Sequence, residues 1–122
     1  MQDLEALWSV LFFVPGQPNL NAGVVIFETG RVFGGDSWYY YTGTYKSENG
    51  KLTATLTSTH YAGPMGSPSM GMRREGTYLF KEIRCGQDDD GNRTIDVTGT
   101  VVEVPAAPQV LARLTWRARL PG

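Results

Sequence analysis

The chain contains one histidine, His60, so an acid–base pair or nucleophile triad based on histidine has to use it. His60 falls on the apolar side of the alternating segment LTATLTSTHY. A histidine in this position is usually a core residue with one hydrogen-bond partner, and the functional alternative is a polar group inside a ligand cavity. An enzyme would also need Asp36 or a glutamate within hydrogen-bonding reach of His60.

The other motifs do not build a catalytic site. The serines lack a G-x-S-x-G turn, and the chain has no phosphate-binding loop and no dinucleotide fingerprint. The acidic run at 88–92, DDDGN, does not fit a calcium loop, because its glycine is misplaced and no glutamate follows at the required spacing. We therefore predict a solvated hairpin loop there, and a non-enzymatic protein without a metal or a cofactor.

Arginines form two further groups, Arg73-Arg74 and the stripe of Arg113, Arg117 and Arg119. They could attract phosphate, but on the outward face of a strand we expect them to aid solubility and to pair with residues such as Asp96. The net charge is −1. Since nucleic-acid-binding domains are usually strongly basic, we predict no nucleic-acid partner.

The bulk composition predicts one soluble domain over residues 1–122. The single cysteine, Cys85, excludes an intramolecular disulfide and a cysteine metal cluster. The apolar run 6–14 is too short for a membrane span and does not resemble a secretory signal. We predict a cytoplasmic protein with no membrane span.

The elements that must position these residues are strands. Thr29-Gly30 and Asn49-Gly50 each divide two apolar or alternating runs, which is typical of tight hairpins. The run from Leu7 to Val14 fits a strand better than a helix starting at Asp3, because everything downstream is β.

The second half of the chain continues the strand pattern, with strands expected over 77–84 and 93–103 and a final strand of period two. In that last strand the predicted inward residues are Val110, Ala112, Leu114, Trp116, Ala118 and Leu120. About eight strands linked mainly by short turns predict an all-β fold, a small antiparallel up-and-down (lipocalin-like) barrel, with a sandwich as the alternative. The irregular segment 62–75 is a surface loop or, alternatively, a lid or contact surface.

The stretch GRVFGGDSWYYYTGTY, residues 30–45, carries aromatic residues on both faces of a strand. That suits a strand covered by the core on one side and by a partner or loop on the other. Gly43 marks a close backbone approach or a bend, and Asp36 can accept hydrogen bonds from the N–H groups that follow it. We interpret the stretch as a barrel corner, with a ligand platform as the alternative.

At this point the sequence resembles the GrlR-type family, negative regulators of type III secretion. The resemblance covers roughly residues 6–61. It rests on the pattern G-x-x-x-x-x-x-G-x-x-x-G-G-D followed by a tyrosine and a glycine, which this chain matches with Gly23, Gly30, Gly34, Gly35, Asp36, Tyr41 and Gly43.

The resemblance implies an eight-stranded lipocalin-like barrel that forms a homodimer and holds a transcriptional regulator through an acidic run in the loop after the tyrosine-glycine strand. Here that loop, 46–51, contains Glu48 as its only acidic residue and looks like a plain hairpin. The first hypothesis is therefore a non-enzymatic regulatory or binding barrel that contacts a protein partner or a small apolar ligand. The alternative is a small-molecule carrier. The residues expected to line its cavity are Tyr39, Tyr41, His60 and Trp116.

Overall fold

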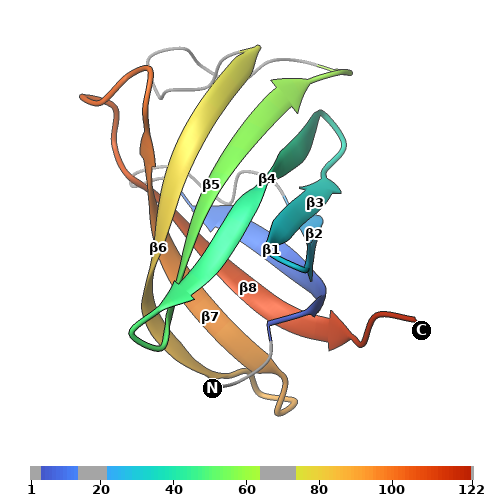
Figure 1. Ribbon diagram of the computed structural model, residues 1–122. Coiled ribbons are helices and arrows are strands. Elements are labelled where there is room, and N and C mark those ends of the chain that lie inside the picture. Colours follow the sequence, from blue (N-terminus) through green and yellow to red (C-terminus); the bar gives the residue numbers. More distant parts are fainter. Residues whose placement is uncertain (1–3, 14–21, 64–73, 122) are drawn as a thin grey trace.

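The computed structural model describes residues 4–13, 22–63 and 74–121, and within them it is built of strands (Figure 1). The strands are β1 (Ala6–Phe13), β2 (Ala22–Glu28), β3 (Arg31–Gly35), β4 (Tyr39–Glu48), β5 (Lys51–His60), β6 (Glu75–Gln87), β7 (Arg93–Val101) and β8 (Val110–Ala118).

Each strand pairs antiparallel with the next one in the chain, and β8 pairs with β1, so the sheet closes into an eight-stranded barrel. The predicted up-and-down barrel is confirmed. The strand interpretation of the first apolar run is also confirmed, with β1 shifted by one residue from the predicted bounds. Closure leaves every strand with two neighbours, so the described sheet has no free edge.

Two of the hairpins turn through residues with positive φ. Thr29 and Gly30 have φ of 51° and 79°, and Asn49 and Gly50 have φ of 53° and 79°. Positive φ at both central positions is the backbone of a type I′ turn, whose twist matches that of the two strands. Both predicted hairpins are confirmed. Glu48 ends β4, and the loop that follows it is the tight turn of Asn49 and Gly50.

The acidic run between β6 and β7 is a turn closed by its own first residue. Asp88 Oδ1 accepts the backbone N–H groups of Asp90 and Asn92, at 2.9 and 2.8 Å. These bonds and the side-chain amide of Asn92 hold the pKa of Asp88 below its ordinary value. The carboxylate therefore satisfies the backbone of the turn, as expected for a hairpin loop.

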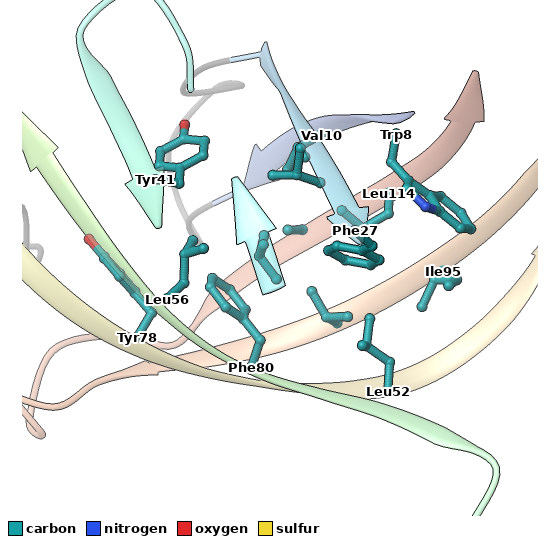
Figure 2. Close-up of a cluster of buried hydrophobic side chains, with 14 of the residues drawn as sticks. Trp8, Val10, Phe27, Tyr41, Leu52, Leu56, Tyr78, Phe80, Ile95 and Leu114 are labelled. Atoms are coloured by element: carbon teal, nitrogen blue, oxygen red, sulfur yellow. The ribbon is translucent and has the colours of Figure 1, made fainter. Parts of the chain in front are cut away.

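Alternate side chains fill the barrel, because successive residues of a strand point to opposite faces. The buried cluster includes Trp8, Val10, Phe27, Leu52, Leu56, Phe80, Ile95 and Leu114, and Figure 2 shows their side chains meeting inside the strands. In β5 the predicted alternation is confirmed, with Leu52, Leu56 and Ser58 buried and Lys51 and Thr55 exposed.

The structure corrects some strand details. β6 is longer than expected and β7 ends two residues earlier, at Val101. Thr115, predicted to face solvent, is only 8% exposed, and the pairing of β1 with β8 shifts register between Leu7 and Trp8. The shift falls between Trp116 and Ala118 on β8, so Thr115 keeps its place opposite Ser9 on the outer side, where neighbouring groups cover it. Residues 64–73 of the predicted irregular segment 62–75 lie outside the residues that the structure describes.

Candidate functional site

Asp36 is the centre of the turn between β3 and β4. Its Oδ1 accepts the backbone N–H groups of Trp38 and Tyr39, both at 2.8 Å, and its Oδ2 accepts the hydroxyl of Tyr41. The carbonyl of Asp36 accepts the hydroxyl of Tyr61 at 2.7 Å. The prediction that Asp36 satisfies freed backbone groups is confirmed, and the same carboxylate also ties the turn to a side chain inside the barrel.

Two glycines near Asp36 are required by close backbone contact. A Cβ added to Gly34 would lie 2.0 Å from the carbonyl oxygen of Val24, and one added to Gly43 would lie 2.0 Å from that of Thr55. Neither contact can be relieved without moving a backbone. The close backbone approach predicted at Gly43 is confirmed, and the glycine and aspartate positions of this stretch have structural roles.

Three of the four predicted cavity residues lie at the same end of the barrel. Tyr39 and Tyr41 are buried neighbours on the inner face of β4, and the rings of Tyr39 and His60 meet edge to face with centroids 5.3 Å apart. Trp116 does not join them, because it pairs with Trp8 near the opposite end of the barrel. Alternation predicts that a residue faces inward, but not its height along the barrel.

The structure adds Tyr78 and Phe12 to this end of the barrel. Tyr78 is buried and stacks on Phe80, with centroids 5.8 Å apart, and Phe12 meets Tyr41 edge to face at 5.9 Å. Figure 2 shows Tyr41 and Tyr78 at one end of the buried cluster and Trp8 with Ile95 at the other. In the sequence, both residues could have been found from the alternation of their strands, which places them on the inner face.

The tyrosine hydroxyls at this end are neutral hydrogen-bonding groups. Burial, reinforced by the bond to Asp36, raises the pKa of Tyr41 above its ordinary value. Burial, with smaller contributions from Tyr39 and Glu103, raises the pKa of Tyr78 to about 12. Both side chains therefore stay protonated near neutral pH and contribute no charge of their own.

His60 is held by local backbone. Its Nε2 lies 2.7 Å from the carbonyl oxygen of Gly63. The carboxylate of Asp36 binds the turn and Tyr41, and within the described part of the chain it makes no hydrogen bond to His60. Among the described residues, the side chain of His60 thus has one hydrogen-bond partner, as expected of a structural histidine.

The middle of the barrel is filled by its own side chains. The apolar cavity between residues such as Val10, Val25, Leu56 and Phe80 has a volume of about 40 Å³. Pockets for small molecules usually measure about 300–1,000 Å³. This cavity is therefore too small for a typical ligand unless the surrounding strands rearrange.

The opposite end of the barrel holds the buried side chain of Trp8. The indole Nε1 of Trp8 donates to the carbonyl of Leu4 at 3.0 Å, and the guanidinium carbon of Arg93 lies 5.4 Å from the indole ring centroid. Glu82 accepts the backbone N–H of Leu52 at 2.9 Å. A cavity of about 170 Å³ lies among these groups, bordered also by Cys85.

The outer surface of β2, β3 and β4 carries an apolar patch. Val24, Phe33 and Tyr40 are 46%, 41% and 47% exposed. Ile26 pairs directly with Phe33, and Val24 and Tyr40 both pair with Gly35, which has no side chain to separate them. We call Val24, Ile26, Phe33 and Tyr40 the outer apolar patch. Tyr40 gives β4 an aromatic residue outside as well as inside, as the sequence predicted.

The closed barrel defines the class of fold. Searches against protein-family models and against curated proteins found no match to the chain. Within the described residues, no helix is long and apolar enough to cross a membrane.

Proposed function

We propose that this protein is a non-enzymatic regulatory or binding protein of the GrlR type, which acts through protein–protein contact. The outer apolar patch carries this proposal. Exposed apolar side chains that gather on neighbouring strands, rather than being scattered singly, are typical of interaction sites. The filled interior supports contact through the outer surface over a small apolar ligand or a carrier role, because the central cavity is only about 40 Å³.

We further propose that the patch joins two copies of the chain. Glu28 and Arg31 face each other across β2 and β3 beside the patch, and the guanidinium carbon of Arg31 lies 5.7 Å from the ring centroid of Phe33. In a twofold dimer the same surface meets itself, so a rim with one acidic and one basic residue can pair with its own copy. Another regulatory protein remains the second class of partner for this surface.

The proposed location is the cytoplasm. Cys85 is a free, exposed thiol. Exposed unpaired thiols are maintained by the reducing conditions inside cells, whereas oxidising compartments favour disulfides.

Sedimentation velocity at micromolar to high-micromolar concentration tests the dimer. We expect the wild type to sediment as a dimer and Phe33→Glu to sediment as a monomer, because the substitution places a charge in an apolar contact. Leu79→Glu is the matched control, since Leu79 is 45% exposed on β6, outside the patch. A wild type that stays monomeric at high concentration, or a Phe33→Glu variant that stays dimeric, would contradict the proposal.

A further inference from the structure

One arginine of β6 and one of β8 share a carboxylate on the outer surface of the barrel. Asp96 on β7 receives two hydrogen bonds from Arg84 on β6, at 3.0 and 2.9 Å, and two from Arg113 on β8, at 2.7 and 3.0 Å. The pairing of Arg113 with Asp96 was expected from the sequence. The participation of Arg84 was not, because the bulge after Glu82 places it opposite Asp96.

Each guanidinium uses the same edge to bind Asp96. Arg84 and Arg113 both donate through Nε and Nη2, and because each Nη2 carries two N–H groups, one N–H of each Nη2 is left over from the bonds to Asp96. The two Nη2 atoms lie within 3.0 Å of the same carboxylate oxygen, Oδ2, so they are no farther apart than about 6 Å. Two oxygens of one small oxoanion can span a pair of donors at that separation.

The charge of the cluster is not balanced. Two guanidinium groups share one carboxylate, and their side chains are 71% and 48% exposed, whereas that of Asp96 is 11% exposed. Arg113, and then Arg84, hold the pKa of Asp96 below its ordinary value, so the carboxylate stays ionised near neutral pH. Arg117 lies on the same outer side, where its Nε donates to Ser9 at 2.8 Å.

We propose that Arg84 and Arg113 form a binding site for an oxoanion group, a phosphate or carboxylate carried by a ligand or partner. Asp96 acts as a positioning residue that fixes both guanidinium planes before the anion arrives, so less side-chain freedom is lost on binding. A bound monoanion would neutralise the excess charge of the cluster. This site is separate from the outer apolar patch and its function does not depend on a dimer.

The test uses the whole chain labelled with ¹⁵N. Inorganic phosphate is added at constant ionic strength, with chloride as the balancing anion, while the backbone amides and arginine Nε–H signals are followed. We expect saturable shifts of the signals of Arg84, Asp96 and Arg113, with half-saturation on the order of 1 mM. The signals of Arg31, which lies on β3, are the internal control and should not move.

Lysine substitutions separate this geometry from plain charge. Arg84→Lys and Arg113→Lys each keep the positive charge and leave one arginine on Asp96, and we expect each to weaken phosphate binding at least fivefold, because lysine cannot bind through two points of a planar fork. Arg74→Lys, at an exposed arginine outside both the cluster and the outer apolar patch, is the matched control and should bind phosphate as the wild type does.

Acetate in place of phosphate identifies the preferred group, and saturation by either anion supports the site. Two results would overturn the proposed oxoanion site. One is equal shifts with chloride alone, and the other is unchanged phosphate affinity in both Arg84→Lys and Arg113→Lys. Phe33→Glu should bind phosphate normally, so failure here is distinguishable from failure of the proposed dimer.

Discussion

Replacing Asp36 by alanine is expected to destabilise the barrel much more than removing any one of the groups that its carboxylate accepts. The carboxylate accepts two backbone N–H groups and the hydroxyl of Tyr41, which is 3% exposed. An unsatisfied buried polar group costs about 1–3 kcal/mol. Because water can reach part of the turn, we expect Asp36→Ala to lower the free energy of unfolding by roughly 3–5 kcal/mol.

Tyr41→Phe removes one of these bonds and leaves the turn capped. We expect it to cost about 1–1.5 kcal/mol, since the hydroxyl disappears together with its need for a partner. Asp36→Asn keeps an acceptor for the turn and should lie between the two. In the double variant Asp36→Ala/Tyr41→Phe, the two costs should be non-additive by about 1 kcal/mol, because both substitutions break the same bond.

Urea unfolding followed by tryptophan fluorescence measures all four variants. The equilibrium slope with urea should stay constant, so that differences in midpoint report stability alone. Two results would refute the reasoning. One is an Asp36→Ala variant no less stable than Tyr41→Phe, and the other is strict additivity in the double variant.

Three further predictions concern the backbone and the buried hydroxyls. Gly43→Ala should lower the free energy of unfolding by about 1–3 kcal/mol through a backbone clash, whereas Gly86→Ala, whose added Cβ would meet its nearest atom at 3.6 Å, should be neutral or slightly stabilising in the same urea assay. Thr29→Asn should stabilise the first hairpin by about 0.5–1 kcal/mol and Asn49→Thr should destabilise the second by a similar amount, because asparagine adopts positive φ more easily than a β-branched residue; equal midpoints would contradict this. The pKa of Tyr78 is raised to about 12 in the fold. The stability that its protonated hydroxyl contributes to the folded state is therefore fully present below pH 10 and is lost as the pH rises towards 12. Tyr78→Phe should flatten that alkaline loss of stability, and an unchanged pH profile would count against the assigned burial effect.

Alternation and turn chemistry predicted the barrel because both act locally. The period of two in LTATLTSTHY and the Asn49-Gly50 turn fix which side chains face inward and where the chain reverses. They do not fix the level of a residue along the barrel axis, which depends on how far each strand is displaced against its neighbours. The sequence therefore predicted the face of Trp116 but not its level, which is that of Trp8 and not that of Tyr39 and Tyr41.

Only part of the hydrogen bonding of the Asp36 carboxylate could be predicted from the sequence. A carboxylate in a turn commonly accepts nearby backbone N–H groups, and that part followed from the sequence. Its second oxygen reaches Tyr41 because β4 returns past the turn, which is a consequence of the three-dimensional corner. Arg84 joined Asp96 for a similar reason, since a bulge in β6 changed its pairing.

The seam between β1 and β8 sets the order in which the protein can be completed during synthesis. β1 is a strongly apolar strand and the first of the eight to be synthesised, and one of its two neighbours, β8, is the last of the eight. Until β8 arrives, the hydrogen-bonding groups on one side of ALWSVLFF have no native partner, and such a segment is prone to pair with other chains. Nascent chains that stop before residue 110 should therefore aggregate or recruit chaperones, and soluble yield should rise sharply once β8 is included.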